Sequence, residues 1–246
     1  MELATEKSKK LEVIEIFKSI NGEGMRAGEL TTFVRFKGCN LKCAYCDTSW
    51  ANKKDAECHE MTVKEIANVI EKHQIANVTL TGGEPLLQND ITELVGEITK
   101  KKLKNKSFQV PGFRVEIETN GAVSIAEIDA YRKRKGLNEQ VRLTLDYKLP
   151  SSGMEDKMIS DNFDRGNLTK RDSVKFVCSD RTDLERAVEV IKRYRLTDKC
   201  YVIFSPVYGK IDPKEIVEFM KEHKLNGVRI QLQLHKYIWD PDERGV

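Results

Sequence analysis

The sequence predicts an α/β protein whose parallel sheet is wound into a partial (β/α) barrel, open on one side. Short runs rich in Val, Ile and Phe, typical of buried strands, recur along the 246-residue chain. A helix-start signal follows most of these runs, and this alternation indicates βαβ units with right-handed connections. About six or seven mostly parallel strands are expected, which is fewer than the eight strands of a complete barrel.

The expected strands combine β-branched and aromatic residues in short runs bounded by turn residues. They are residues 31–36, 78–81, 113–118, 141–146, 173–177, 201–204 and 228–232.

Helices are predicted where a Thr, Ser or Asp precedes a Glu by three residues, which is the pattern of a capping box. These pairs are Thr62 with Glu65, Asp90 with Glu93, Ser124 with Glu127 and Thr182 with Glu185. Asp212 followed by Pro213 predicts another helix, because proline suits the first helical position. Residues 148–172 are polar, contain Gly and Pro, and lack helical periodicity, so they are expected to form a long loop.

The composition gives no sign of a membrane or nucleic-acid partner. The net charge is +3, and the basic run at residues 100–106 has no interleaved aromatic residues, so it is expected to be a solvated helix end. No window approaches the roughly 18 consecutive apolar residues of a membrane span. Residues 1–10 are charged and do not resemble a secretory signal. We therefore expect a single-domain cytoplasmic protein over residues 1–246.

The ends of the expected strands carry unusual residues, and chemistry gathers at such ends in parallel α/β folds. A cysteine cluster follows the first of these strands. The later strand ends carry, in order, Gly82 to Pro85, Thr119 to Gly121, Asp146 to Lys148, Ser205 with Pro206, and Gln233 with His235. All of them are expected on one rim of the barrel.

Cys39, Cys43 and Cys46 form a C-x3-C-x2-C cluster in the loop after the first of these strands. Each iron of a [4Fe–4S] cluster takes one thiolate, so three cysteines hold three irons and leave the fourth iron open. An open coordination site marks a reactive metal centre rather than a structural one. The spacing therefore predicts a catalytic iron–sulfur cluster.

Other uses of the cysteines fit less well. A zinc site is disfavoured because only one C-x2-C pair is present and the nearest histidine, His59, lies thirteen residues beyond Cys46. A ferredoxin-like electron carrier needs a fourth cysteine within reach. Cys178 and Cys200 end apolar runs and are expected in the core, whereas Cys58 is expected in a surface loop. A disulfide framework is not expected in a cytoplasmic chain of this size.

The cysteine spacing, with Tyr45 before the third cysteine, resembles the radical SAM superfamily, where SAM is S-adenosylmethionine. Gly82-Gly83-Glu84-Pro85 resembles the GGEP motif of that superfamily. The resemblance implies that SAM chelates the open iron through its amino and carboxylate groups. It also implies that electron transfer from the reduced cluster breaks a C–S bond of SAM and yields a 5′-deoxyadenosyl radical.

Further motifs resemble one family within this superfamily, the 7-carboxy-7-deazaguanine synthases. They are S-x-N-G-E-G at 19–24, T-F-V-R-F-K-G-C-N-L at 32–41, C-D-T at 46–48, E-I-E-T-N-G at 116–121, K-L-P-S-S-G-M at 148–154, Q-L-H-K-Y-I-W at 233–239 and R-G-V at 244–246. The resemblance begins at residue 17 and so covers nearly the whole chain.

The family resemblance implies a ring contraction in which 6-carboxy-5,6,7,8-tetrahydropterin loses ammonia and becomes 7-carboxy-7-deazaguanine, on the way to queuosine-type bases. The implied cofactors are a [4Fe–4S] cluster, SAM that is regenerated, and Mg²⁺. The implied partners are the small pterin substrate, a one-electron reductant of the flavodoxin or ferredoxin type, and a second copy of the chain in a homodimer. Residues 1–30 are then an extension that contributes to the substrate pocket, and residues 37–60 hold the cluster loop.

By the same resemblance, three sets of site residues are expected. The metal ligands are Cys39, Cys43 and Cys46 for the cluster and Thr48 for Mg²⁺. The SAM-binding residues are Tyr45, Cys46, Asp47, Gly83, Glu84, Asp146, Tyr147, Lys148 and Ser205. The substrate-binding residues are Ile20, Asn21, Gly22, Glu23, Arg35, Thr81, Gln233, His235 and Val246. Arg35 offers the planar fork of donors that a carboxylate favours, and Glu23 offers acceptors for the N–H edge of a pterin.

The chain departs from the family pattern at two places. Asn21 stands where the family usually has Gln, and Asp146-Tyr147 replaces the commoner Ser-Pro before Lys148. The alternative function is a radical SAM activase that takes hydrogen from a glycine of a partner enzyme. An activase needs a surface for a large protein, whereas the S-x-N-G-E-G opening and the Q-x-H tail indicate a pterin pocket.

Overall fold

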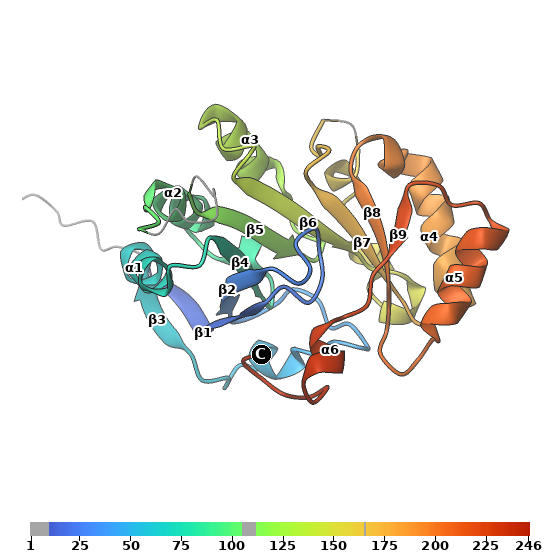
Figure 1. Cartoon of the computed structure of the whole chain (residues 1–246), viewed down its shortest axis with the longest axis horizontal. Helices are drawn as coiled ribbons and strands as arrows, with labels where there is room; N and C mark the ends of the chain where they lie inside the picture. The colour runs from blue at the N-terminus through green and yellow to red at the C-terminus, as the bar shows by residue number, and fades with distance from the viewer. Residues whose placement is uncertain (1–9, 105–111, 165) are drawn as a thin grey trace, which may run out of the picture.

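One nine-stranded sheet organises the computed structural model, which describes residues 10–104, 112–164 and 166–246. The strand order is β3-β1-β2-β4-β5-β6-β7-β8-β9, and the sheet curls without closing (Figure 1). The strands are β1 (Lys10–Ile20), β2 (Leu30–Phe36), β3 (His59–Thr62), β4 (Asn77–Gly82), β5 (Arg114–Thr119), β6 (Val141–Tyr147), β7 (Ser173–Cys178), β8 (Tyr201–Pro206) and β9 (Val228–Ile230). The prediction of an open, mostly parallel partial barrel is confirmed.

Seven strands, β2 and β4 to β9, pair in parallel and match the seven expected runs. β1 and β3 were not predicted, and they add an antiparallel edge to the sheet. β1 pairs with β2 and places residue 20 opposite residue 30. Residues 10–20 therefore belong to the sheet itself.

The α-helices are α1 (Val63–His73), α2 (Ile91–Lys100), α3 (Ala126–Arg134), α4 (Arg181–Tyr194), α5 (Pro213–Glu222) and α6 (His235–Ile238). Figure 1 shows α1 to α3 along one half of the curled sheet, α4 and α5 along the other, and α6 at the lower rim between the two halves. In the described part of the chain, no helix has the length and apolar character needed to cross a bilayer. The basic run at 100–106 begins at the end of α2, and its residues 105 and 106 lie outside the described residues.

Helix starts were predicted with mixed success. The capping box of Thr62 with Glu65 is present, and Asp212 caps α5 ahead of Pro213. The capping box predicted for Asp90 with Glu93 is wrong, because Asp90 has a φ of 64° and its side chain makes no capping hydrogen bond. The other two boxes are also wrong: α3 follows Ile125 without a side-chain cap, and α4 starts earlier, capped by Asp180. In α4 the Asp180 carboxylate accepts from the Asp183 backbone N–H and so takes the role predicted for Thr182.

The two faces of the sheet differ in chemistry, since successive strand residues point to opposite faces. One set of side chains is apolar and packs against the helices, as do Leu80, Ile117, Leu145, Phe176 and Phe204. The intervening set is buried and polar: Thr79, Glu116, Thr144, Lys175 and Ser205. A complete barrel of this kind is usually filled by Val, Ile and Leu. The polar interior here therefore indicates a barrel that receives a polar ligand.

The loop over residues 148–172 contains no α-helix among its described residues, as expected, but it is more buried than its composition indicates. Short 3₁₀ turns η3 (Pro150–Ser152), η4 (Glu155–Lys157) and η5 (Ser160–Asn162) shape it. Its end is anchored by Asp172, which accepts two hydrogen bonds from Arg132 at 2.7 and 2.8 Å. Asp129 also accepts from Arg132, and all three side chains are almost completely buried.

Candidate active site at the strand ends

The three clustered cysteines lie in the loop between β2 and the 3₁₀ turn η1 (Ser49–Asn52), and all are free and half-buried. Cys39 Sγ accepts from the backbone N–H of Leu41 at 3.4 Å and from Asn120 Nδ2 at 3.5 Å. Asn52 Nδ2 lies 3.9 Å from Cys46 Sγ. The cysteine loop is therefore tied to the end of β5 through Asn120.

The electrostatics of this loop couple the three thiols. Burial raises the pKa of Cys43, Lys148 opposes that rise, and the thiols of Cys46 and Cys39 add to it. Burial also raises the pKa of Cys39. Among the described residues, no three His, Cys, Asp or Glu side chains converge as the ligands of a single ion do. The three thiols thus influence one another electrostatically but do not converge on a single-ion site.

The double-glycine turn after β4 packs directly on the start of the cysteine loop. Gly82 has a φ of 129°, and a Cβ atom at Gly83 would lie 1.8 Å from the carbonyl oxygen of Gly38. The Gly83 N–H donates to Phe36 O at 3.0 Å, and the Glu84 N–H donates to Gly38 O at 2.8 Å. Only glycine allows the ends of β2 and β4 to approach this closely.

Glu84 is fully buried behind this turn. Its Oε1 accepts from Thr119 Oγ1 at 2.8 Å, and its Oε2 accepts from the Asn120 N–H at 2.7 Å. Burial raises the pKa of Glu84 to about 7. The side chain joins the ends of β4 and β5, and its contact with SAM stays a prediction.

The N-G-E-G turn after β1 brings the two ends of the chain together. Gly22 O accepts from the Leu234 N–H at 3.1 Å, and a Cβ at Gly22 would lie 2.3 Å from Nδ1 of His235. The Gln231 side chain exchanges two hydrogen bonds with the Gly24 backbone, at 2.7 and 2.8 Å. Burial lowers the pKa of His235, so its imidazole is neutral at neutral pH.

Asn21, at the start of this turn, is almost completely buried. Its Oδ1 accepts from Thr79 Oγ1 at 2.8 Å, whereas its Nδ2 is buried without a partner. A buried donor without a partner is costly, which leaves Nδ2 suited to a ligand acceptor.

Glu23 is the centre of the polar interior. Its Oε1 accepts from Ser205 Oγ at 2.7 Å, and its Oε2 accepts from Lys175 Nζ and Gln233 Nε2, both at 3.2 Å. Burial by itself raises the pKa of Glu23, but Lys175 and these hydrogen bonds outweigh burial and lower it. Glu23 is therefore a carboxylate at neutral pH. Ser205, expected beside SAM, contacts Glu23 in this structure.

Asp146 continues the same network. Lys175 Nζ lies 3.3 Å from Asp146 Oδ1, and Lys148 Nζ donates to Asp146 Oδ2 at 2.9 Å. Burial acts to raise the pKa of Asp146, but the two lysines outweigh it and lower the pKa. The structure thus links a residue predicted to bind substrate, Glu23, to two predicted to bind SAM.

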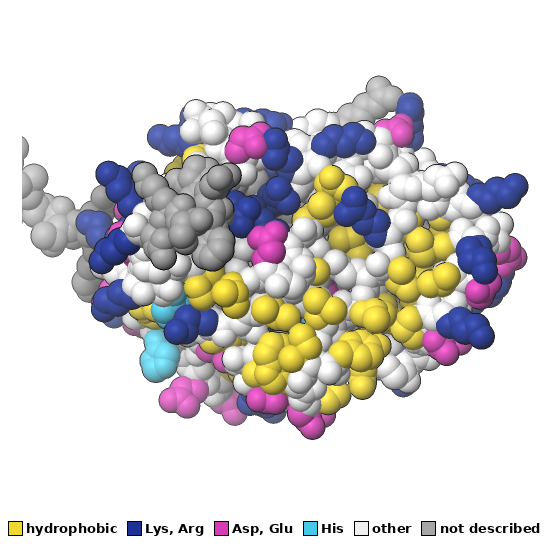
Figure 2. Space-filling view, in the orientation of Figure 1, with side chains coloured by type: hydrophobic (Ala, Val, Ile, Leu, Met, Phe, Trp, Pro, Cys, Tyr) yellow, Lys and Arg dark blue, Asp and Glu magenta, His cyan; other side chains and the backbone are white. Residues whose placement is uncertain are grey.

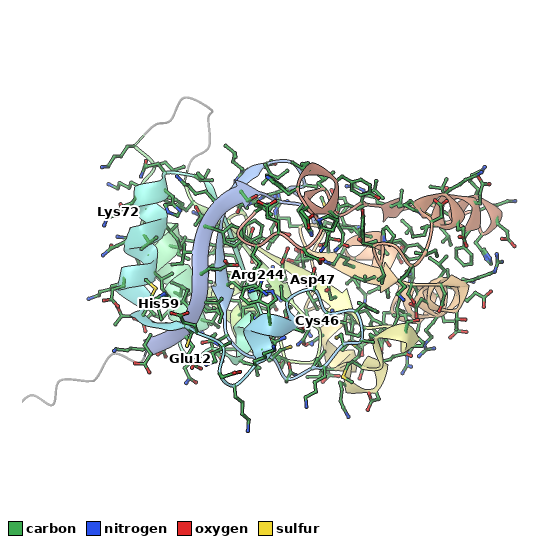
Figure 3. All side chains as sticks on the ribbon, turned by 90° about the horizontal axis from the view of Figure 1, so that it is seen from below. Glu12, Cys46, Asp47, His59, Lys72 and Arg244 are labelled. Atoms are coloured by element: carbon green, nitrogen blue, oxygen red, sulfur yellow. The ribbon has the colours of Figure 1, made fainter. Side chains whose placement is uncertain are left out.

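Arg35 lies next to Thr81 in the register of β2 and β4. Its Nε donates to Glu15 Oε1 at 2.7 Å, so part of its fork is already paired. The guanidinium also lies over Trp50, 5.9 Å from the ring centre, and Arg244 lies 4.2 Å from the centre of that ring. Figure 3 shows Arg244 in the central part of the view, together with Cys46 and Asp47.

Several predicted residues have other contacts. Tyr45 donates to Val177 O at 3.1 Å, and Thr81 Oγ1 donates to Glu118 Oε2 at 2.8 Å. The Tyr147 ring packs with the rings of Phe163 and Phe176. The predicted SAM contact of Tyr147 would therefore be made by its backbone and not by its side chain.

The remaining predicted positions make few contacts of their own. Thr48 Oγ1 lies 3.7 Å from Cys46 Sγ, and Asp47 is exposed. Ile20 and Val246 are half-buried. Their roles stay predictions.

Three residues at this rim were missed by the sequence analysis: Trp50, Glu118 and Lys175. A lysine inside an otherwise apolar strand is a signal that could have identified Lys175, since lysine is rarely buried unless it is paired. Glu118 shares its strand and its face with Glu116, and that alternation could have indicated an acidic interior.

Comparison with known proteins agrees with this geometry. The family model of the radical SAM superfamily matches residues 33–220. The chain is 47% identical to a 7-carboxy-7-deazaguanine synthase of Clostridium acetobutylicum, over 95% of this chain and 98% of that protein. It is 38% identical to one of Leptospira interrogans, over 96% of this chain and 98% of that protein.

The chain belongs to the 7-carboxy-7-deazaguanine synthase family of radical SAM enzymes. A solved structure of QueE from Escherichia coli shares the fold of this family member with a TM-score of 0.64, at 20% identity and over 91% of this chain and 93% of that one.

The residues present suit the cluster of a 7-carboxy-7-deazaguanine synthase. In a [4Fe–4S] cluster each thiolate binds a different iron, so three neighbouring thiols that do not converge on one point fit such a cluster. The N–H groups of Leu41 and Asn120 directed at Cys39 are the kind of hydrogen bonds that tune a bound thiolate. The [4Fe–4S] cluster and SAM are the cofactors of this family, and the assignment of Cys39, Cys43 and Cys46 as the cluster ligands stays a prediction.

Proposed function

We propose that this protein converts 6-carboxy-5,6,7,8-tetrahydropterin into 7-carboxy-7-deazaguanine with loss of ammonia. The observation that carries the proposal is near-complete coverage by relatives named for this activity, together with three thiols on the rim of a polar barrel. The cluster and SAM together supply radical abstraction of a hydrogen atom. The chain's own residues must bind the pterin, orient it and keep water away.

The interior residues have the chemistry that a pterin requires. The ionised Glu23 accepts from the N–H groups of the pterin ring, and its three protein donors fix where it points. Asn21 Nδ2 is a free buried donor for a ring acceptor. The neutral imidazole of His235 can donate and accept at the same edge. Arg35 binds the pterin carboxylate with the part of its fork that Glu15 leaves open.

The same proposal includes Mg²⁺ held through Thr48 and substrate oxygens, since this ion is usually bound through its substrate and few protein ligands. It also includes an external one-electron reductant of the flavodoxin or ferredoxin type. The cytoplasm is the proposed compartment, because Cys58, Cys178 and Cys200 are free thiols outside the cluster and such thiols persist where the environment is reducing. A single radical SAM domain over residues 1–246 carries these functions.

A homodimer is the proposed assembly. Its support is an apolar surface over α6, where Figure 2 shows hydrophobic side chains gathered on one face. Tyr208, Tyr237 and Ile238 expose about half of their surface there, and the two tyrosine rings pack edge to face. Exposed apolar patches often mark protein interfaces. A Tyr237→Arg variant should sediment as a monomer under conditions where the unmodified protein is a dimer.

An anaerobic turnover assay tests the proposed activity. Reconstituted protein receives SAM, Mg²⁺, a strong reductant and 6-carboxytetrahydropterin, and mass spectrometry follows the products. The expected result is 7-carboxy-7-deazaguanine in excess of the SAM consumed. Formation of 5′-deoxyadenosine without any deazaguanine would reject this substrate and favour the activase alternative.

Two variants separate the cluster from the substrate pocket in this assay. Cys43→Ala should lose most of the iron and all turnover, because one iron loses its thiolate. Glu23→Gln keeps the size of the side chain, so it should retain the iron and lose pterin turnover. Normal turnover by Glu23→Gln would remove Glu23 from the site.

A further inference from the structure

Lys175 is a buried lysine in the middle of β7, between the fully buried Val174 and Phe176. Its side chain is 9% exposed and points into the polar interior. A lysine in such a place must be paired, because an unpaired buried charge is strongly unfavourable. Its two partners are Glu23 at 3.2 Å and Asp146 at 3.3 Å.

These partners come from opposite sides of the site. Glu23 belongs to the N-G-E-G turn, where the pterin is proposed to bind, and Asp146 ends β6, where SAM is predicted to bind. Lys148 takes the second oxygen of Asp146, which leaves Lys175 as the cation shared by both carboxylates. Ser205 and Gln233 also donate to Glu23, but both are neutral.

The charges around Glu23 make this shared cation necessary. Asp146 and Glu118 face Glu23 as further acids, His235 faces it from the tail, and Lys175 is the cation within ion-pair distance of Glu23 among the described residues. Without Lys175, burial and the neighbouring acids both favour the protonated form of Glu23.

This inference rests on the proposed function. We propose that Lys175 is a positioning residue that fixes Glu23 and Asp146 relative to each other, and so sets the position of the bound pterin relative to SAM. Lys175 need not touch either molecule, since it acts through the two carboxylates. Its removal should then weaken pterin binding in a manner that depends on pH. Above the pKa of Glu23 the carboxylate reforms, and part of the affinity returns.

The test measures the dissociation constant of 6-carboxytetrahydropterin for the anaerobic, reconstituted protein with SAM, by calorimetry without added reductant. For the unmodified protein Glu23 stays ionised between about pH 6 and about pH 8.5, so any change of the constant in this range comes from other groups such as Glu118, whose pKa is about 7, and gives the baseline for the variants. For Lys175→Met it should rise at least about tenfold near pH 6, the usual scale for losing one partner of a buried charge pair, and recover as pH increases. Lys175→Arg should restore most of the affinity.

Lys133→Met is the control, because it removes a lysine whose partner, Asp129, lies on α3 and outside the predicted site. It should leave the pH dependence of pterin binding as it is in the unmodified protein. Should Lys175→Met fail to fold, Ser205→Ala removes a neutral Glu23 partner and should weaken binding without introducing the pH dependence. Tight, pH-independent binding by folded Lys175→Met would overturn the role of Lys175. No pterin binding by the unmodified protein would overturn the proposed function and this inference together.

Discussion

The guanidinium of Arg244 lies 4.2 Å from the centre of the Trp50 ring, which connects the C-terminal tail to the turn just after the cysteine loop. Arg35 approaches the same ring at 5.9 Å. Trp50 thus lies near two arginines, one from β2 and one from the tail. The proposed carboxylate-binding arginine and the tail are therefore held by one aromatic side chain.

Replacing Trp50 by Leu should raise the KM for the pterin about three- to tenfold with a smaller effect on kcat, since a cation–π contact contributes about 0.5–2 kcal/mol. Steady-state kinetics under anaerobic conditions measure both constants. Arg134→Ala removes a cation–π contact with Tyr131 on α3, away from the rim, and is the control. An equal rise in KM in both variants would contradict a specific role for Trp50.

Gly22→Ala should destabilise the protein by about 1–3 kcal/mol, because the new methyl group overlaps the His235 ring and overpacking costs this much. Urea denaturation of the reduced protein measures the change. Combining Gly22→Ala with His235→Ala removes the overlap, so the double variant should be more stable than the sum of the single changes indicates. Additive losses would show that another contact is responsible.

Burial raises the pKa of Glu118 from 4.5 to about 7, so the folded chain keeps the Glu118 proton up to a higher pH than the unfolded chain does. Between about pH 4.5 and pH 7 the unfolded chain releases this proton while the folded chain keeps it, so the stability of the unmodified protein falls as pH rises. The glutamine of the Glu118→Gln variant does not titrate, so the variant does not lose stability in this way as pH rises. The variant should gain up to about 1.4 kcal/mol per pH unit relative to the unmodified protein across this window, and the difference should level off above it.

Urea denaturation at several pH values measures this difference. Thr81 can still donate to the amide oxygen that the Glu118→Gln substitution introduces, so hydrogen bonding is preserved. Glu218→Gln changes an exposed carboxylate and is the control, expected to show little pH dependence of its own. A flat difference between Glu118→Gln and the unmodified protein would contradict the raised pKa.

Arg132→Met should destabilise the protein by about 3–5 kcal/mol, because it leaves the buried carboxylates of Asp129 and Asp172 without their shared cation. Arg181→Met breaks an exposed ion pair with Glu222 and should cost less than about 1 kcal/mol. Urea denaturation of both variants gives the comparison. Similar losses in the two would mean that the buried triad contributes no more than a surface pair.

The parallel strands and the cysteine loop could be predicted because each is encoded locally, by a run of apolar residues or by a fixed spacing. β3 could not, since its four residues, three of them polar, form an edge strand whose existence depends on pairing with β1. β1 alternates between polar and apolar residues over Lys10 to Val13, and the alternation breaks at the irregularity between Val13 and Glu15, so the pattern does not reveal the whole strand. The cap at Thr182 failed because Asp180, two residues earlier, offered a competing acceptor.

The candidate site was predictable where residues match family motifs and not where they act through others. Glu23 and His235 could be named from the sequence, but the contact of His235 with Gly22 requires the fold. Lys175 carries no motif, and its importance comes from two carboxylates that are far from it in the chain. Pairing across the interior of a curled sheet depends on register, which the sequence pattern alone does not provide.

The hydrogen bond between Gln233 and Glu23 spans 210 residues of sequence. During synthesis, the early strands can pair long before this partner leaves the ribosome. The emerging protein therefore carries an unfinished pocket whose acidic centre lacks one of its donors until Gln233, which follows β9, has been made. Completion of the pocket is a late event of folding, so the substrate can contribute to the stability of the finished fold and little to its earlier stages.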